Sequence, residues 1–409
     1  MPLRERTALK TQRKVAIDLA GTSAVIFVPD DTSKTGFSRP LMLARIMGSP
    51  LLSWLVSSLV SRGVGRFFLV CHERFAEEAK ACFPVGVEIM PATDQDAPDL
   101  LHVFLSTAED SEAEVVVVTG PAVLIDRSLA SQADVIPNPS CISHVSREAL
   151  MEALDEKFSF LDFLRQRGKA FSDRDGAYSV KAPEELAAWQ PVLSLTHLHA
   201  LVRAGVEIWD YQNCYVDPSV FVGSGTVLLP GTILRGSTVI GEDCVIGPNS
   251  YLENVTVGDG STVNASQLYD AKVGDGTKIG PFAYVRPNSK IGSHIKVGDF
   301  VEIKNSTIGD GTKIAHLTYV GDSDVGRNVN FGCGTVTVNY DRAKKFRTTI
   351  EDDAFIGCNT NLVAPVTIGR GAYTAAGSTI TDDVPPQALA IARARQSVKK
   401  DWAAKNKRK

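Results

Sequence analysis

The sequence lacks paired-cysteine motifs and long hydrophobic runs. Its seven cysteines are scattered over 409 residues, and no two of them form a Cys-x-x-Cys pair. An odd number of dispersed cysteines argues against a disulfide framework and a structural zinc site, and it favours a reducing compartment. No hydrophobic run reaches the roughly 20 residues of a membrane-spanning helix, and residues 1–6 lack the apolar core of a signal peptide. We therefore expect a cytoplasmic protein with no membrane partner.

A strong net charge is also absent. The formal net charge is −4 at pH 7, so no global charge favours nucleic acid as a partner. Basic residues gather only in residues 4–14 and 399–409, and runs of this kind are usually solvated tails. A hydrophobic fraction of 44% is enough for substantial cores, and the length indicates two domains rather than one.

The first half of the chain alternates strand-like and helical patterns. Strands are expected at residues 23–28, 66–71, 87–90 and 114–119, and helices at residues 50–61 and 73–82. This alternation predicts a parallel sheet covered by helices on both faces, which is an α/β domain over residues 15–183. A connecting segment, residues 184–210, follows and begins with a predicted helix. His197 and His199 lie in that helix and are expected to be structural.

From Tyr215 onward, aliphatic residues recur mostly at intervals of six, with slips after residues 252, 263 and 303 and a longer interruption after residue 314. The recurring positions are 216, 222, 228, 234, 240, 246, 252, 257, 263, 273, 279, 285, 291, 297, 303, 308, 314, 350, 356, 362, 368 and 380. In a hexapeptide repeat each unit forms one strand and one turn, and three units form one triangular coil of a parallel β-helix. The pattern predicts an all-β parallel β-helix over residues 211–384, followed by a basic tail, residues 385–409.

The longest interruption of this ladder, residues 339–349, is too polar to fill the prism. We expect it to project over a neighbouring coil or subunit, since columns of this kind often associate as closed trimers. Near it lies His316, and a neutral histidine is the usual general base. Lysine and asparagine are common on solenoid faces, and a lone histidine there is more often a plain surface residue. The concentration of these types around one interruption is what favours a site.

The polar residues around the interruption suit a sugar phosphate. Arg286, Lys304 and Lys345 are cations of the kind that hold a phosphate group. Asn330 and Asn339 can donate to an oxyanion or accept from a sugar hydroxyl. A groove between neighbouring columns is the expected position of such a site.

Residues 201–395 resemble the C-terminal half of the bacterial bifunctional N-acetylglucosamine-1-phosphate uridyltransferase/glucosamine-1-phosphate N-acetyltransferase family. The matching segments are Ile279-Gly280-Pro281-Phe282-Ala283, Arg286-Pro287, Val297-Gly298-Asp299-Phe300-Val301-Glu302-Ile303-Lys304, His316-Leu317-Thr318-Tyr319-Val320-Gly321-Asp322, Gly334-Thr335, Asn339-Tyr340-Asp341, Lys345-Phe346 and Leu362-Val363-Ala364-Pro365-Val366. The resemblance implies a left-handed β-helix, an exception to the usual right-handed crossover, and a homotrimer. It also implies acetyl-CoA as co-substrate.

The resemblance implies roles for individual residues. His316 would be the general base on the amine of glucosamine-1-phosphate. The sugar phosphate would be held by Arg286, Lys304, Tyr319, Asn330 and Lys345. The acetyl-CoA site would be lined by Cys333, Asn339, Tyr340, Cys358, Ala376 and Arg393. Small or hydroxylated residues are usual in the family where Cys333 and Cys358 stand here. The product, N-acetylglucosamine-1-phosphate, would serve UDP-N-acetylglucosamine biosynthesis for the cell envelope.

The first half departs from the family at three positions. The family's glycine-rich turn after the first strand, which lets the backbone approach the nucleotide phosphates, is Pro29-Asp30-Asp31 here. The family's Pro-Lys appears as Pro40-Leu41, and its metal-binding Gly-Asp appears as Gly120-Pro121. We therefore expect a Rossmann-like, nucleotidyltransferase-like domain that has lost uridyl transfer. No metal site is predicted, and Mg²⁺ is not expected to bind this domain.

Two alternatives remain open at this stage. The first is a working bifunctional enzyme that also makes UDP-N-acetylglucosamine from UTP, with Arg39 or Asp126 compensating for the lost groups. The second is a non-catalytic regulatory homologue on the same scaffold. The joint presence of His316, Lys304, Asn339 and Lys345 argues against the regulatory alternative, because a scaffold would not require all four.

Overall fold

The computed structural model describes residues 18–108, 113–132, 140–155 and 160–406. The predicted basic run at residues 4–14 lies outside these ranges, as do the last three residues of the C-terminal run. The chain forms two compact units, Met1–Phe221 with Leu234–Ser237, and Val222–Ile233 with Thr238–Lys409. In the described residues no helix combines the length and the hydropathy needed to cross a membrane.

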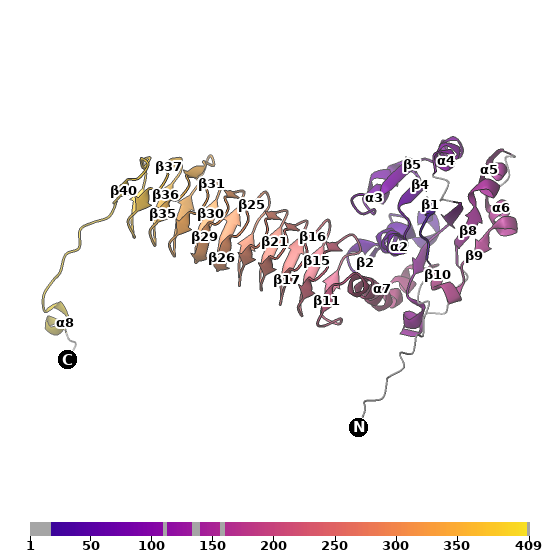
Figure 1. Ribbon diagram of the computed structural model, residues 1–409, viewed down its shortest axis with the longest axis horizontal. Helices are drawn as coiled ribbons and strands as arrows, with labels where there is room; N and C mark the ends of the chain where they lie inside the picture. The colour runs from indigo at the N-terminus through magenta and orange to yellow at the C-terminus, as the bar shows by residue number, and fades with distance from the viewer. Residues whose placement is uncertain (1–17, 109–112, 133–139, 156–159, 407–409) are drawn as a thin grey trace, which may run out of the picture. The chain divides into compact units, whose positions relative to one another are not determined.

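The first unit is built on a six-stranded sheet in the order β5-β4-β1-β6-β8-β9 (Figure 1). Its strands are β1 (Thr22–Val28), β4 (Arg66–Cys71), β5 (Glu88–Ala92), β6 (Glu114–Val118), β8 (Ile142–Ser146) and β9 (Lys169–Ala170). The predicted parallel pairing holds for β5, β4, β1 and β6. The edge strands β8 and β9 are antiparallel, so the sheet is mixed.

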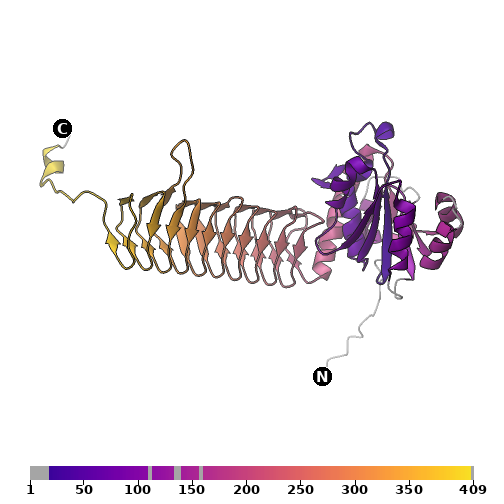
Figure 2. The same ribbon diagram turned by 90° about the horizontal axis from the view of Figure 1, so that it is seen from above.

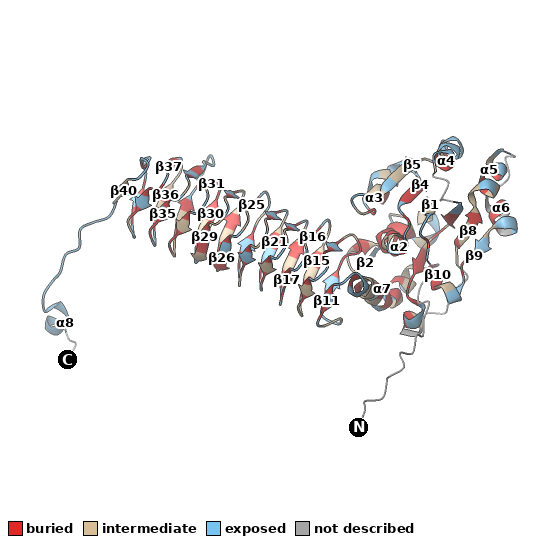
Figure 3. Ribbon diagram, in the orientation of Figure 1, coloured by how far each residue is buried: buried red, intermediate tan, exposed pale blue. Residues whose placement is uncertain are grey.

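Helices cover both faces of this sheet because successive strand residues point to opposite sides. In β1, Ala24 and Ile26 pack into a core with α2 (Leu51–Val60) and α3 (Ala76–Lys80). Val25 packs on the other side with α4 (Ala97–Ser106), α5 (Arg147–Asp155) and α6 (Phe160–Arg167). Figure 3 shows the buried strands between exposed helix surfaces. The predicted α/β domain is therefore confirmed.

A third core cluster joins α2 to the long helix α7 (Pro183–Arg203), β7 (Ala122–Leu124) and β10 (Ala177–Ser179). Within α7, burial lowers the pKa of His197 to about 4, so the ring is neutral at pH 7, and it packs edge-on to Trp54 with ring centroids 6.1 Å apart. His199 packs in the same way on Tyr211 at 5.4 Å. Both histidines thus have structural surroundings.

Shorter elements complete the first unit. They are α1 (Thr32–Thr35), β2 (Arg45–Ile46), β3 (Ser49–Pro50) and the 3-10 turns Leu41–Leu43, Glu73–Phe75, Arg127–Gln132 and Asp173–Asp175.

The remainder of the chain is a left-handed parallel β-helix with three long sheets, as predicted. The 11-stranded sheet contains β11 (Glu207–Ile208), β14 (Val227–Leu228), β17 (Val245–Ile246), β20 (Thr262–Val263), β23 (Lys278–Ile279), β26 (Lys296–Asp299), β29 (Lys313–His316), β32 (Asn330–Phe331), β35 (Phe355–Ile356), β38 (Tyr373–Thr374) and β40 (Leu389–Ala390). The ten-stranded sheet contains β12 (Tyr215–Val216), β15 (Ile233–Arg235), β18 (Tyr251–Glu253), β21 (Gln267–Tyr269), β24 (Tyr284–Val285), β27 (Glu302–Lys304), β30 (Tyr319–Gly321), β33 (Val336–Val338), β36 (Asn361–Val363) and β39 (Thr379–Ile380). The nine-stranded sheet contains β13 (Phe221–Val222), β16 (Val239–Ile240), β19 (Thr256–Val257), β22 (Lys272–Val273), β25 (Lys290–Ile291), β28 (Thr307–Ile308), β31 (Ser323–Val325), β34 (Thr348–Ile350) and β37 (Val366–Ile368).

Each short strand sends one aliphatic side chain into the prism and its neighbours outward. In β27, Ile303 is fully buried, whereas Glu302 and Lys304 lie on the outer face. Leu268, Val325 and Phe331 fill the interior at points where the six-residue ladder slips. Because one side chain per strand points inward, the β-helix has three outer faces, one for each sheet, separated by tight corners.

The β-helix extends beyond its predicted limits of residues 211–384. Its first strand, β11, lies within the predicted connecting segment, and β40 lies within the predicted tail, paired with β38. The spacing from Ile380 to Ala390 exceeds six residues because Pro385 and Pro386 interrupt the repeat. The six-residue periodicity therefore does not predict the last strand. Among the described residues after β40, up to residue 406, the chain forms one further element, the short helix α8 (Trp402–Lys405), which has no buried residue.

Candidate active site

One corner of the β-helix carries a single residue from each of five successive coils. This corner column lies where the 11-stranded sheet turns into the ten-stranded sheet, and it consists of Asp299, His316, Cys333, Cys358 and Ala376. Asp299 and His316 are paired in register. The order continues because the amide of Asn359 donates to the carbonyl of Cys333, and the amide of Gly377 donates to that of Cys358, each at 2.8 Å.

The corner column contains a histidine and a carboxylate in direct contact. Nδ1 of His316 lies 2.5 Å from Oδ1 of Asp299. This hydrogen bond holds the pKa of Asp299 below its usual value, so the carboxylate is ionised and can only be the acceptor in the hydrogen bond. Nδ1 of His316 must therefore carry the hydrogen, and Nε2 of the neutral ring is a free base. The imidazole is 56% exposed and can receive a proton from a bound molecule.

Beside this corner, the outer face of the ten-stranded sheet is cationic. Arg286 donates to Glu302 at 2.8 Å, and its guanidinium lies 5.8 Å from the ring centroid of Tyr284. The hydrogen bond to Glu302 raises the pKa of Arg286. Tyr319 occupies the next coil in register with Glu302, and Lys304 lies two residues further along β27. Three of the predicted sugar-phosphate residues therefore share one face.

A buried carboxylate organises the far edge of that face. Asp322 is 4% exposed, and it accepts hydrogen bonds from the side-chain amides of Asn305 and Asn339. Nζ of Lys304 lies 3.9 Å from its Oδ2. Burial alone would raise the pKa of Asp322, but the two amides and the charges of Lys304 and Lys345 outweigh it and lower the pKa below 3.8. Asp322 is thus a fixed negative charge beneath two lysines.

The ladder interruption between β33 and β34 forms a hairpin-like loop that begins and ends at this edge. Figure 2 shows it standing out from the side of the column. Tyr340 and Lys345 form an antiparallel bridge, and the amide of Phe346 donates to the carbonyl of Asn339 at 2.9 Å. The contact with Lys345 is the largest cause of a lowered pKa at Lys304, and burial adds to it. The loop therefore brings a second ammonium group next to Lys304.

The structure divides the residues predicted for the acetyl-CoA site into three groups. Cys333, Cys358 and Ala376 lie in the corner column. Asn339 and Tyr340 lie at the other edge of the ten-stranded face, where Asn339 is almost fully buried and the hydroxyl of Tyr340 donates to the carbonyl of Arg342. Arg393 follows the last coil.

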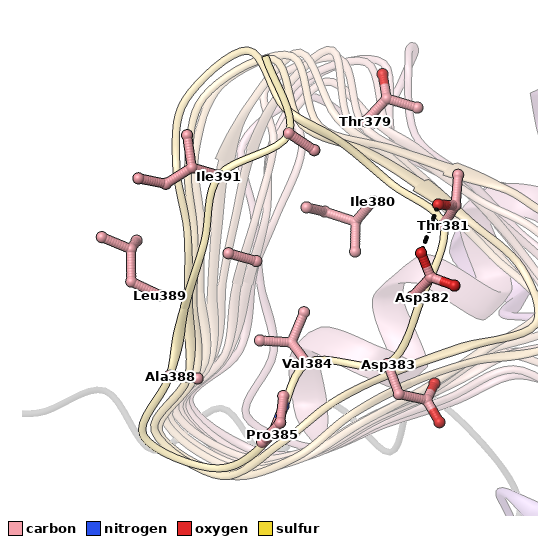
Figure 4. A pocket seen from close by; sticks show the side chains of 12 residues that line it. Thr379, Ile380, Thr381, Asp382, Asp383, Val384, Pro385, Ala388, Leu389 and Ile391 are labelled. Atoms are coloured by element: carbon pink, nitrogen blue, oxygen red, sulfur yellow. Dashed lines mark hydrogen bonds between the residues drawn. The ribbon is translucent and has the colours of Figure 1, made fainter.

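The last coil ends in an open cavity of about 240 Å³, lined by Ile380, Val384, Leu389 and Ile391 among others (Figure 4). Its lining residues end at Ala392, and Arg393 follows at once in the sequence.

Asn330 is separated from the other sugar-phosphate candidates. It lies on the outer face of the 11-stranded sheet, in register with Lys313 and Phe355. Lys304 and Tyr319 lie on the adjacent face of the prism. A single column therefore does not bring Asn330 and Lys304 onto one surface.

Sequence reasoning assigned no role to the acidic partners Asp299, Glu302 and Asp322. Two of them could be found from the coil length, because Asp299 precedes His316 by 17 residues and Asp322 precedes Asn339 by 17. That is the offset between equivalent positions of neighbouring coils here. The pairing of Glu302 with Arg286 follows from a similar offset of 16.

In the first unit, the turn after β1 is held closed by its own aspartates. Oδ1 of Asp30 accepts from the hydroxyl of Thr32 at 2.7 Å, and its Oδ2 lies 2.5 Å from Nη2 of Arg74. Asp31 accepts from the backbone amide of Leu41 at 2.9 Å. Leu41, where the family has a lysine, is buried. The backbone amide of Leu41 is thus engaged within the protein rather than presented to a ligand.

The two groups that could replace the lost family residues have partners of their own. Arg39 forms an ion pair with Glu78. Asp126 is 4% exposed, accepts from the amide and hydroxyl of Ser128, and lies 3.7 Å from Arg203. In the described ranges, no group of three histidine, cysteine or acidic side chains has the arrangement of a metal site.

Known proteins resemble this chain over both of its halves. The family "Bacterial transferase hexapeptide (six repeats)" matches residues 219–254, 237–266, 270–305 and 347–382. The protein named "Bifunctional protein GlmU" in Clostridium perfringens (strain SM101 / Type A) is 50% identical over 242 residues, which cover 59% of this chain. In that match the chain spans about half, 53%, of the relative's length.

Other relatives with the same name extend the comparison. The Brevibacillus brevis protein is 57% identical over 208 residues, covering 51% of this chain and 45% of the relative. The Acetivibrio thermocellus protein is 36% identical over 450 aligned positions, covering 93% of this chain and 97% of the relative. Because that similarity runs through the α/β unit as well as the β-helix, the chain belongs to the bifunctional GlmU family.

Proposed function

We propose that this protein transfers the acetyl group of acetyl-CoA to the amine of glucosamine-1-phosphate, a step in UDP-N-acetylglucosamine biosynthesis. The observation that carries this proposal is the His316–Asp299 pair, which leaves an exposed basic nitrogen at the edge of a cationic face. The family relationship supports the same reaction, since the relatives are described as bifunctional GlmU proteins.

The residues suit direct transfer from thioester to amine. Nε2 of His316 accepts a proton from the attacking neutral amine, and the new C–N bond forms as the C–S bond to coenzyme A breaks. The imidazolium then returns a proton to the departing thiolate. Asp299 keeps the ring in the tautomer with Nδ1 protonated and stabilises its positive charge. No acyl-enzyme is required.

Lys304, Lys345 and Arg286 are the groups proposed to hold the sugar phosphate. The phosphate dianion would lie over Lys304 and Lys345, whose mutual repulsion lowers the pKa of Lys304 in the free protein. The 3.9 Å separation of Lys304 from Asp322 is loose for an ion pair, so the ammonium group is free to turn toward a ligand.

The working unit is proposed to be a homotrimer. Asn330 and the residues of the cationic face lie on different faces of one prism, so one column carries only part of the predicted set. In a closed trimer, two different faces of neighbouring columns meet across each groove. That arrangement allows Asn330 of one subunit to complete the face of the next.

The α/β unit is proposed to have lost uridyl transfer. Asp30 and Asp31 add negative charge where a triphosphate would approach, and they are engaged with Arg74, Thr32 and Leu41. Pro121 supplies no carboxylate for Mg²⁺, which would otherwise neutralise the leaving pyrophosphate. Calorimetry with UTP and Mg²⁺ should give no micromolar binding, and pyrophosphate release should stay at background. Either signal would restore the bifunctional alternative.

The acetyltransferase proposal is tested with the purified full chain. Acetyl-CoA and glucosamine-1-phosphate are supplied together, and free thiol is followed continuously. We expect thiol release that depends on the amino sugar and a product with one added acetyl group by mass spectrometry. Glucose-1-phosphate, which lacks the amine, is the matched control. Equal thiol release with glucose-1-phosphate, or none with either sugar, would overturn the proposal.

A further inference from the structure

The seven cysteines fall into two chemical classes. Burial raises the pKa of the thiols of Cys82 and Cys141 to about 11 and that of Cys214 to about 12, and it also raises the pKa of Cys71 and Cys244. These five are held as unreactive thiols. Cys333 and Cys358 are different, because Cys333 is partly exposed and Cys358 is exposed.

The two accessible cysteines occupy equivalent positions on neighbouring coils. Asn330 and Phe331 pair in register with Phe355 and Ile356, and the amide of Asn359 donates to the carbonyl of Cys333. Cys333 and Cys358 therefore stand one above the other although 25 residues separate them in sequence. Neighbouring strands of a sheet are about 4.8 Å apart, which lies within the range of Cα separations that a disulfide spans.

Side chains of the corner column do reach one another across a single coil step. His316 and Asp299 hold the two preceding positions of the column, and their side chains are in direct contact at 2.5 Å. In the adjacent corner position, Phe282 and Phe300 stack with ring centroids 5.4 Å apart. Cys333 and Cys358 hold the next two positions of the same column, so their side chains leave the backbone one coil step apart on the same corner.

We propose that Cys333 and Cys358 form a modification site that reacts with disulfide oxidants and closes to a reversible Cys333–Cys358 disulfide. One thiolate attacks the oxidant disulfide and releases one thiol. The second cysteine attacks the resulting mixed disulfide and releases the other thiol. The protein loses two electrons and two protons, and the oxidant disulfide becomes two thiols. Oxidised glutathione is the probe of this class.

The consequence for activity rests on the proposed function. Cys333 and Cys358 directly follow His316 in the corner column and belong to the predicted wall of the acetyl-CoA site. A disulfide would join two separate side chains into one rigid bridge on that wall. We expect the oxidised protein to lose affinity for acetyl-CoA, with KM rising at least about tenfold, and dithiothreitol to restore it.

The chemical part of the proposal has a readout independent of activity. The reduced full chain is treated with oxidised glutathione, alkylated under denaturing conditions and digested with trypsin. Cleavage after Arg327, Arg342, Arg347 and Arg370 leaves Cys333 and Cys358 on separate peptides, each with one cysteine. A crosslinked species with the summed mass of these peptides less two hydrogens is expected, together with the loss of two alkylatable thiols.

Variants assign the bond. Cys333→Ala and Cys358→Ala should each abolish the crosslink, whereas Cys141→Ala, which changes a buried thiol of the α/β unit, should leave it unchanged. Activity is compared for each variant as the ratio of oxidised to reduced protein, since either change can alter basal turnover. Each single variant keeps one accessible thiol that can stop at the glutathione mixed disulfide, so a ratio near one is expected only when Cys333→Ala and Cys358→Ala are combined.

The outcomes separate this inference from the proposed function. A persistent glutathione adduct without crosslink, or a crosslink to any other cysteine, would overturn the pairing. A crosslink in a protein whose reduced form does not acetylate glucosamine-1-phosphate would leave the disulfide in place and remove the proposed function. An active enzyme that keeps its KM for acetyl-CoA after complete crosslinking would overturn the proposed consequence.

Discussion

At the scale of single residues, the direct contact between His316 and Asp299 fixes which ring nitrogen of His316 can act as a base. Asp299 has a pKa below its unfolded value because of the hydrogen bond to His316. A carboxyl group of this kind contributes stability above its unfolded pKa and loses that contribution only as the pH falls through the lower folded value. The carboxylate of Asp299 therefore stays ionised at neutral pH, and in the proposed reaction it is His316 that takes up the proton.

Replacing His316 by Ala should lower kcat by roughly two to four orders of magnitude, the usual size of a general-base contribution. Asp299→Asn keeps the shape but removes the charge that fixes the tautomer, so a smaller loss of about 10- to 100-fold is expected. Steady-state kinetics with saturating acetyl-CoA measures both. If Cys333→Ala or Cys358→Ala were as inactive as His316→Ala, or an acetyl-cysteine were trapped, direct transfer would be wrong.

The two neighbouring lysines make a second prediction at this scale. Lys345 lowers the pKa of Lys304, and a bound phosphate dianion favours the charged ammonium and raises that pKa again. Binding of glucosamine-1-phosphate should therefore take up protons when the pH approaches the lowered pKa of Lys304 from below. Calorimetry in two buffers of different ionisation enthalpy detects this uptake as a difference in observed heat.

Lys345→Met provides the matched control for that measurement. Without its neighbour, Lys304 should return toward its ordinary pKa, and the buffer dependence at the same pH should shrink. Sugar-phosphate affinity should fall at the same time, because one cation is lost. If the original protein gave the same observed binding heat in both buffers, the two lysines would not bind the phosphate.

At the scale of elements, the sequence was most informative where repetition was strict. The six-residue ladder predicts the β-helix because burial of one aliphatic side chain per strand repeats in every coil, as with Ile303 and Ile314. It could not predict β40, since Pro385 and Pro386 change the spacing. The antiparallel edge strands β8 and β9 were also missed, because strand direction depends on tertiary pairing.

In the candidate site, too, the sequence indicates the residue types but not the contacts between residues of neighbouring coils. Residue types alone singled out His316 and the lysines. The contacts of Asp322 with Asn305, Asn339 and Lys304 depend on which coils lie next to each other. They are therefore determined by coil length rather than by any local motif.

The loop between β33 and β34 yields a prediction about Asp322. Asp322→Ala removes the acceptor of the Asn339 amide and the counter-charge of Lys304, which leaves a buried donor unpaired at a cost of about 1–3 kcal/mol. We expect faster hydrogen exchange in residues 340–347 and a raised KM for the sugar phosphate. Asp324→Ala is the control, since Asp324 is an exposed partner of Arg347 at 2.6 Å, and such pairs contribute at most about 1 kcal/mol. Equal effects of the two changes would contradict a special role for Asp322.

At the scale of the whole molecule, the separation of Asn330 from Lys304 raises the question of whether the site lies within one subunit or between two. If one column held a complete site, every residue of the set would act within its own chain. If sites lie between columns, Lys304 of one subunit works with Asn330 of the next. Both residues are on outward faces of the same prism, but the faces belong to different sheets. We propose the second design, because a closed trimer brings two different faces of neighbouring columns together.

Mixing two defective variants tests that design directly. Lys304→Ala and Asn330→Ala, each with low activity alone, are co-expressed with different affinity tags and purified through both. Purification through both tags leaves only trimers that contain both variants, and in each of these one groove of the three pairs an intact Lys304 face with an intact Asn330 face, so about a third of full activity should return. Sites within single chains cannot recover in this way, because each chain carries one defect. Activity no higher than the sum of the two variants, in verified mixed trimers, would place Asn330 and Lys304 in the same subunit's site or remove Asn330 from it.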